Sequence, residues 1–304
     1  MLFTRTPLGQ VRRVALLGIV MAVVLVAGTP APGSTASAEV PVQPRPPVQV
    51  IADEDKLSIP GESTLPPGTT TFRVSTPRGT PNTPSRWVIA VRLRPDVPLT
   101  AFLETMTTVM RSVDPVERAR AVRKWNRQAT ALGGVSVTGD APQTFTPFLT
   151  SGTYYLMDLR SLAQPDPGDP VRRLTAQGDW QVEPVEFDQV IEHFIGADGQ
   201  PRFSAPGRLA AHARLLVRNR TGAHEEAILM QVRADTTEQD VQRMIRGEGP
   251  DPVIAQPRGI TPIAGGNQVV AHLDLVPGRY LLISWVNNPQ AMHRFIDVGQ
   301  RPPR

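Results

Sequence analysis

The stretch SGTYYL at residues 151–156 decides the fold, because it reads as a β-strand entered through a glycine and occurs again, little changed, as PGRYLL at 277–282. A second pair of similar stretches, VRLRPD at 91–96 and MQVRAD at 230–235, precedes these two in the same order. Features that recur in one order along a chain indicate a structural unit used twice. The sequence therefore predicts two related regions, each rich in strands.

Each region opens with an alternating strand that follows a proline–glycine approach. Phe72 and Val74 alternate with polar residues in the first region, and Leu215 and Val217 do so in the second. A period of two is typical of a strand with one buried face. We therefore expect one face of each strand to line an apolar interior.

Helical patterns follow the second strand of each region. One apolar face is formed by Leu99, Phe102, Leu103, Met106, Val109 and Met110. Asp114 is the expected N-cap of another helix, with Pro115 in its first turn and Glu117 completing a capping box. In the second region, Thr236 or Thr237 is the expected N-cap of a helix that contains Val241. Short strands with few helices predict an all-β protein with small helical insertions, built as two β-sandwich domains in tandem.

The boundaries of these domains are set by runs of proline and glycine. We expect a signal peptide over residues 1–38 and a Pro-rich disordered linker over 39–50. The first β-sandwich domain, with its helical insertion, is expected over 51–162 and the second over 185–300, with a linker at 163–184.

The export prediction rests on three features at the start of the chain. Arg5, Arg12 and Arg13 precede an apolar run over residues 14–27, which is shorter than the roughly 20 residues of a membrane span, and a small-residue cleavage pattern follows at 36–38. An uncleaved anchor and twin-arginine export remain alternatives to cleavage and Sec export. The predicted location is secreted, extracellular or cell-wall associated, or periplasmic in a Gram-negative source.

Composition narrows the chemistry further. The chain contains no cysteine, which excludes disulfides, thiolate metal ligands and a thiol nucleophile. Its 32 basic side chains fall to 29 against 28 acidic ones once the signal peptide is removed. A nearly neutral chain without a clustered basic stripe is a poor candidate for nucleic-acid binding. Nearly all of the basic residues are arginine, which is typical of a high-GC, actinobacterial-type genome.

The second region resembles the cupredoxin family, which are Greek-key sandwiches that carry type 1 copper. The resemblance rests on NRTGAH at 219–224, GRY at 278–280 and MHRFIDV at 292–298, and it covers most of the second region and, more faintly, the first. It implies cupredoxin-like domains in both. Type 1 copper takes two imidazoles, a thiolate and a weak axial methionine.

The resemblance also implies where a copper site would lie and shows that it is degenerate. His224 falls at the first histidine position and Met292 at the axial methionine, whereas Ser284 stands at the cysteine position and Asp158 at its counterpart in the first region. Blue-copper electron transfer is excluded by the missing thiolate. A His/Met set of His224, Met292, His293 and His272 is the candidate for weak copper binding.

These patterns leave three hypotheses for function. The first is a secreted, non-enzymatic binding or interaction protein of the bacterial cell envelope or extracellular space, with no catalytic residues and no cofactor. Its partner is an unknown envelope protein or a small ligand, without nucleic acid and without membrane insertion after signal cleavage. The second is a copper-binding protein that uses His224 and Met292. The third is a hydrolase assembled from scattered carboxylates, which no spacing supports.

Overall fold

The computed structural model describes residues 45–61, 63–77, 84–139, 141–287 and 292–299. The predicted signal peptide and the first half of the Pro-rich linker, residues 39–44, lie outside the described residues. Strand β1 (Val48–Ala52) begins inside the segment predicted as that linker.

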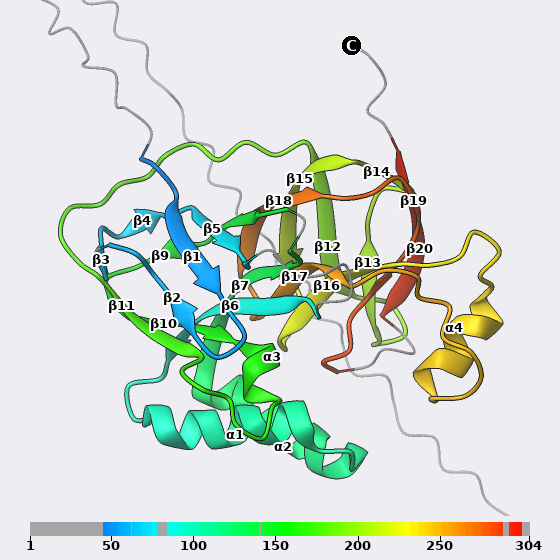
Figure 1. The fold of residues 1–304 in the computed structure, drawn as a ribbon, viewed down its shortest axis with the longest axis horizontal. Helices are drawn as coiled ribbons and strands as arrows, with labels where there is room; N and C mark the ends of the chain where they lie inside the picture. Colours follow the sequence, from blue (N-terminus) through cyan, green and yellow to red (C-terminus); the bar gives the residue numbers. More distant parts are fainter. Residues whose placement is uncertain (1–44, 62, 78–83, 140, 288–291, 300–304) are drawn as a thin grey trace, which may run out of the picture. The chain divides into compact units, whose positions relative to one another are not determined.

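Two large sheets make up the described part of the chain (Figure 1). The eight-stranded sheet has the order β13 (Pro201–Ser204), β12 (Gln189–Ile195), β15 (His212–Asn219), β18 (Gln268–Asp274), β8 (Gln143–Thr146), β5 (Phe72–Ser75), β1, β2 (Leu57–Ser58). The ten-stranded sheet has the order β14 (Arg208–Ala210), β20 (His293–Gly299), β19 (Gly278–Ile283), β16 (Glu225–Gln231), β17 (Arg258–Ile263), β7 (Ala129–Val137), β6 (Arg86–Leu93), β10 (Gly152–Asp158), β11 (Val171–Ala176), β3 (Thr64–Leu65). A short pair, β4 (Gly68–Thr69) with β9 (Phe148–Leu149), stands apart from both.

Both sheets run without interruption from one predicted region into the other. β8 pairs with β18 and β7 pairs with β17, each antiparallel. On either side of these two pairs the strands follow in mirrored order, so that β6 corresponds to β16, β10 to β19 and β5 to β15. The all-β class with small helical insertions and a two-sheet sandwich architecture is therefore confirmed, and the two halves join edge to edge.

The interior between the sheets is one apolar cluster that contains residues of both halves. Phe72, Val74 and Leu156 belong to it from the first half, and Leu215 and Leu229 from the second. Phe72 and Val74 are buried while Arg73 between them is exposed, as the period of two predicts. Burial of both halves in one interior ties their stabilities together.

Two glycines allow neighbouring strands of the ten-stranded sheet to approach closely at the junction. A Cβ on Gly134 in β7 would lie 2.0 Å from the carbonyl oxygen of Val88 in the neighbouring strand β6. Gly259 in β17 has φ +127°, and a Cβ there would lie 2.3 Å from the carbonyl oxygen of Ala227. Any larger residue would have to push neighbouring backbone aside at these two places.

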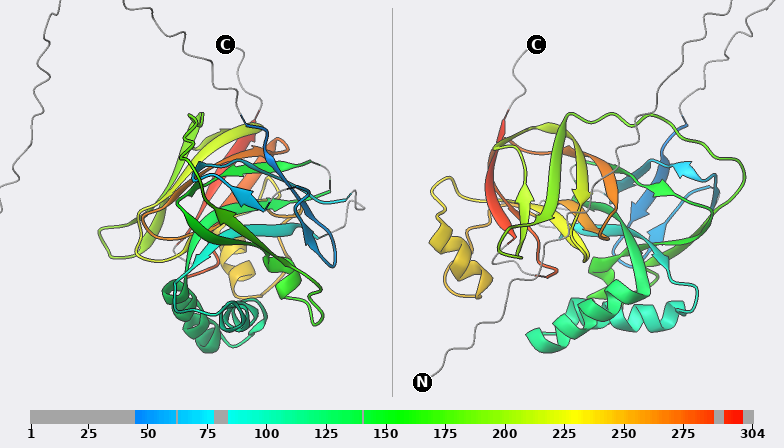
Figure 2. Two further views of the ribbon diagram at one scale, coloured as in Figure 1. Left: turned by 90° about the vertical axis from the view of Figure 1, so that its left-hand side faces the viewer. Right: turned by 180° about the vertical axis from the view of Figure 1, so that it is seen from behind.

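The helices cover the outer face of the ten-stranded sheet. Helices α1 (Leu99–Arg111) and α2 (Pro115–Gln128) lie side by side below the strands in both views of Figure 2, and they pack an apolar cluster that includes Met106 and Trp125 against the sheet. Helix α3 (Leu159–Leu162) follows β10, and helix α4 (Glu238–Ile245) covers the second half. No helix in the described ranges is long and apolar enough to cross a membrane.

The helix caps agree with the sequence in part. Asp114 accepts a hydrogen bond from the Val116 N–H at 2.8 Å, and Thr237 forms a reciprocal capping box with Asp240. The predicted box at Glu117 is wrong, because that carboxylate accepts a hydrogen bond from the Ser112 hydroxyl at 2.5 Å instead of reaching the backbone of Asp114.

The segment 163–184, predicted as a linker, contains strand β11. This strand pairs antiparallel with β10 over six residues and parallel with β3. The prolines at 165, 167 and 170 precede the strand, which is why the run of breakers resembles an unpaired connection in the sequence.

Candidate functional site

A polar triad, in which Glu225 and Ser284 are buried and Asn287 is exposed, lies where β16 begins and β19 ends. The Ser284 hydroxyl donates to Oε2 of Glu225 at 2.8 Å, and Nδ2 of Asn287 donates to Oε1 of Glu225 at 3.0 Å. The same amide nitrogen donates to the carbonyl oxygen of His224 at 2.5 Å. Both oxygens of the Glu225 carboxylate are therefore bound by the loop that leaves β19.

The corresponding end of the first half carries a second triad. Arg86 is the first residue of β6, as Glu225 is of β16, and Asp158 ends β10 six residues after Gly152, as Ser284 follows Gly278 by six. Nη2 of Arg86 forms a salt bridge to Oδ2 of Asp158 at 2.5 Å, and Arg86 also donates to Ser161.

Ser161 completes this triad and lies three residues after Asp158, as Asn287 lies three after Ser284. Its hydroxyl donates to Oδ2 of Asp158 at 3.2 Å. The other oxygen of Asp158 accepts from the N–H groups of Trp87 and Arg160, at 3.3 and 3.0 Å. In each half, the side chains at the same three positions are thus joined to one another by hydrogen bonds, although the residue types differ.

These residues do not fit a type 1 copper ion. A thiolate is absent, and Ser284 and Asp158 occupy the expected cysteine positions. The Arg86 guanidinium beside Asp158 repels a cation in the first half, and the Glu225 oxygens are both engaged in the second. Copper of this type needs soft ligands that neither triad offers.

Glu226 is a second buried carboxylate next to the triad. Its Oε1 accepts from the N–H of Trp285 at 2.8 Å. Burial first, and then the neighbouring charge of Glu225, raises the pKa of Glu226 to about 7, while the Trp285 N–H and Arg118 oppose the shift. Burial also raises the pKa of Glu225, against the hydrogen bonds from Ser284 and Asn287. Two adjacent carboxyls thus resist ionisation.

His224 is held in the wall between α2 and β7. Its Nε2 accepts from the N–H of Ala131 at 3.3 Å, and its ring lies 4.7 Å from that of Trp125 between centroids. Burial lowers its pKa to about 4, with a smaller effect of Arg94, against the Ala129 carbonyl. The imidazole is therefore neutral near pH 7, and its Nδ1 has no hydrogen-bond partner among the described residues.

The structure does not bring the four predicted metal ligands to one place. Met292 is buried in the interior, whereas His293 lies on the outer face of the ten-stranded sheet, where its Nε2 is 2.6 Å from Oε1 of Glu238 in α4. His272 faces solvent from the eight-stranded sheet, in register with Arg214. Over the described ranges, no three His, Asp or Glu side chains are grouped to hold a metal ion.

The sequence analysis missed four polar residues of the second half, of which Glu225, Glu226 and His193 are buried and Asn287 is exposed. Glu225, Glu226 and Asn287 have no metal or catalytic spacing around them, so nothing marked them. His193 in β12 is fully buried with its ring 5.0 Å from that of Phe203, and neither ring nitrogen has a hydrogen-bond partner among the described residues. Burial lowers its pKa to about 3, so it packs as a neutral ring. His193 lies two residues after the apolar Ile191, and residues two apart in a strand share one face of the sheet. This spacing was the signal in the sequence that the His193 side chain faces inward.

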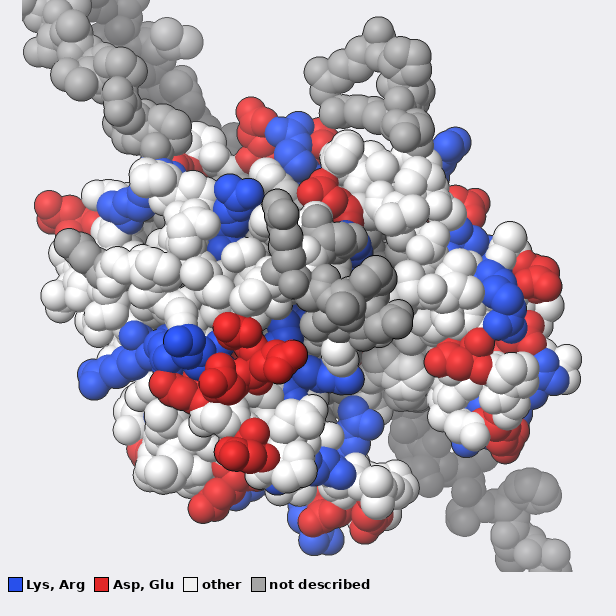
Figure 3. Space-filling view, viewed as in Figure 1, with Lys and Arg blue, Asp and Glu red and all other residues white. Residues whose placement is uncertain are grey.

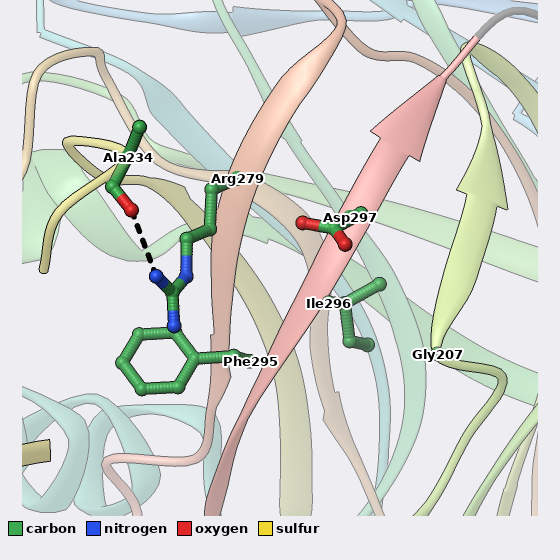
Figure 4. Close-up of a pocket in the computed structure, with 6 residues that line it drawn as sticks. All are labelled: Gly207, Ala234, Arg279, Phe295, Ile296 and Asp297. Atoms are coloured by element: carbon green, nitrogen blue, oxygen red, sulfur yellow. Dashed lines mark hydrogen bonds between the residues drawn. The ribbon is translucent and has the colours of Figure 1, made fainter. Parts of the chain in front are cut away.

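One surface pocket, of about 420 Å³, lies beside β19 and β20 (Figure 4). Arg279 lies over the ring of Phe295, 4.1 Å from its centroid, and donates to the carbonyl oxygen of Ala234 at 2.8 Å. Asp297 lines the other side of the pocket. These contacts fix the guanidinium as part of the pocket wall.

A larger pocket, of about 580 Å³, lies on the outer face of the eight-stranded sheet around His272. Arg214 in this pocket is paired with both Glu186 and Asp188, and Nδ1 of His212 is 2.7 Å from Oδ1 of Asp274. The charged groups of this pocket are therefore largely matched to one another.

No family model matches the chain, and no curated protein matches it. Solved structures to which it is similar include a multicopper oxidase, at 10% identity over 83% of this chain and 88% of that chain, with a TM-score of 0.23. Rusticyanin from Thiobacillus ferrooxidans matches at 16% identity over 36% of this chain and 75% of that one, with a TM-score of 0.24. A copper nitrite reductase from Nitrosomonas europaea matches at 10% identity over 84% and 93%, with a TM-score of 0.22. At these identities and TM-scores the likenesses carry no argument about a ligand or an activity.

Replacing one member of the Arg86–Asp158 pair should lower the free energy of unfolding more than replacing both members. Asp158→Leu leaves a buried guanidinium without its partner, which is expected to lower the free energy of unfolding by about 3–5 kcal/mol. The double variant Arg86→Met, Asp158→Leu should recover part of that loss, as measured by urea unfolding. The exposed pair Arg246–Glu248 is the control, and Glu248→Ala there should change the free energy little. A double variant that loses the sum of the two single losses would contradict this account.

Glu226 should make the protein less stable as the pH rises. Because its pKa is about 7 in the folded state and near 4.5 when unfolded, the folded state binds more protons between these values, so its stability falls as the pH rises through them. The free energy of unfolding of Glu226→Gln should therefore rise, relative to that of the wild type, by on the order of 2–3 kcal/mol between pH 5 and pH 8. Urea unfolding at each pH measures this gain, with the exposed Glu104→Gln as the control. A gain that does not depend on pH would sink the assignment.

Proposed function

We propose that this chain is an exported, non-enzymatic binding protein of the bacterial cell envelope or extracellular space. One observation carries the proposal: the same three positions in each half are closed by hydrogen bonds among their own residues. Arg86, Asp158 and Ser161 do this in the first half. Groups that are satisfied by one another in the interior are not available to a substrate or a metal ion.

The other buried polar residues support this proposal. His193 and His224 are buried neutral rings. A general base must lie within hydrogen-bond reach of the substrate proton that it removes, and burial keeps both rings away from a substrate. The Glu226 carboxyl, with its pKa near 7, is enclosed behind the Trp285 backbone. A protein that retains a sandwich without a reactive site acts through its surfaces, because function lies in sites and not in the fold.

Copper handling is the second candidate, favoured by one specific contact. The Ser284 N–H donates to the carbonyl oxygen of Met292 at 2.9 Å, which places that methionine beside the Glu225 triad. Nδ1 of His224 has no hydrogen-bond partner among the described residues. In this reading Met292 and His224 hold copper after the buried groups rearrange.

The metal content of the purified mature chain separates the two candidates. After incubation with Cu(I) and with Cu(II) and removal of free metal, the binding role predicts well under one copper per chain by elemental analysis. One copper per chain, lost in both His224→Ala and Met292→Ala but kept in the exposed-site control His212→Ala, would establish copper handling in its place. His212 is a matched control because its side chain is exposed and paired with Asp274.

A further inference from the structure

Helix α2 presents a row of basic side chains on the side away from the protein. Arg120, Arg123, Lys124 and Arg127 stand at positions i, i+3, i+4 and i+7, which share one face of a helix, and all four are exposed. Val122 and Trp125, on the opposite face, are buried against the sheet. We call these four residues the α2 basic face.

The charges of the α2 basic face are not neutralised by the protein. None of the four residues has an ion-pair partner among the described residues, whereas Arg243 in α4 is paired with Asp240 at 2.5 Å. Figure 3 shows basic and acidic side chains together over the lower, helical part of the molecule. Within α2, however, the acidic side chains are confined to the start, where Asp114 caps the helix and Glu117 accepts from Ser112. The remaining basic residue of the helix, Arg118, acts on buried Glu226 instead.

Two exposed valines lie at the turn where α1 meets α2. Val113 is 99% exposed and Val116 is 63% exposed. Val116 lies four residues before Arg120 and seven before Arg123, so it continues the row of the α2 basic face. The exposed side of the hairpin thus combines apolar side chains at its tip with cations along its length.

We propose that the α2 basic face docks on an anionic phospholipid bilayer, with the four cations at the headgroup phosphates and Val113 and Val116 in the interfacial region. This inference names a partner for the proposed binding role and rests on it. Basic helices with apolar side chains bind in the interface plane, since charge attraction and apolar burial add together. A phosphate-containing wall polymer would supply the same anionic groups for the cations but no apolar environment for Val113 and Val116. This difference favours the bilayer. The docking is peripheral and inserts no helix.

Vesicle binding by the mature chain tests the proposal. The chain should sediment with vesicles of phosphatidylglycerol and phosphatidylcholine in equal parts, and not with phosphatidylcholine alone. A basic residue at such a surface contributes about 1 kcal/mol, or roughly fivefold in partition. The partition coefficient onto anionic vesicles should therefore fall at least fiftyfold in the variant that has glutamine at all four positions of the α2 basic face. A matched variant with glutamine at the exposed residues Arg73, Arg173, Arg202 and Arg246, which has the same net charge, should bind as the wild type does.

A fluorophore at the hairpin tip reports the apolar contact directly. Because the chain has no cysteine, a Val113→Cys variant can be labelled at one site with an environment-sensitive probe. Its emission should shift to the blue on anionic vesicles, while the same probe on Ile254→Cys, an exposed site outside the hairpin, should not respond.

Three results would overturn the bilayer proposal: equal binding by the two quadruple variants, no shift of the probe at residue 113, or binding to soluble poly(glycerol phosphate) without binding to vesicles. None of these results touches the metal-content test, so failure here leaves the binding role in place with another partner. One copper per chain would overturn the binding role whatever the vesicles show.

Discussion

The antiparallel pairing of β7 with β17 and of β8 with β18 is the constraint on which the rest of the structure depends. These pairs leave no strand edge open between the halves and make both sheets continuous. They also enclose one apolar interior to which both halves contribute. Gly134 and Gly259 lie at this junction because their neighbours leave no room for a side chain. The strand order is mirrored about these pairs, and the polar triads lie at the first residues of β6 and β16.

Enclosing the strand ends creates the electrostatic features of the molecule. Polar groups that begin β6 and β16 are buried, so each must find a partner or lose its charge. The first half answers with a salt bridge between Arg86 and Asp158, and the second with hydrogen bonds to the Glu225 carboxylate. Among the residues that the structure describes, the Glu226 carboxylate accepts a single hydrogen bond, from the backbone N–H of Trp285, and its pKa is raised to about 7. The charges that remain free of such partners on α2 face outward, away from this interior.

The local elements could be predicted from the sequence, whereas the contacts between them could not. Alternation marked β5 and β15, and the caps at Asp114 and Thr237 marked the starts of α2 and α4. The pairing of β7 with β17 left no local trace, because it joins edges more than 120 residues apart. The triads were missed for the same reason: Glu225 meets Ser284 only after folding. Strand β11 was hidden by the prolines before it, and the α2 basic face was present in the helical periodicity but looks like scattered charge along the chain.

The claim that the halves share one interior is tested most directly by calorimetry of the purified protein. The continuous sheets predict a single unfolding transition whose van't Hoff enthalpy equals its calorimetric enthalpy, because neither half keeps its interior closed once the β7–β17 and β8–β18 pairs are lost. Two resolved transitions, or a van't Hoff enthalpy near half the calorimetric value, would show that the halves unfold separately and would contradict the account.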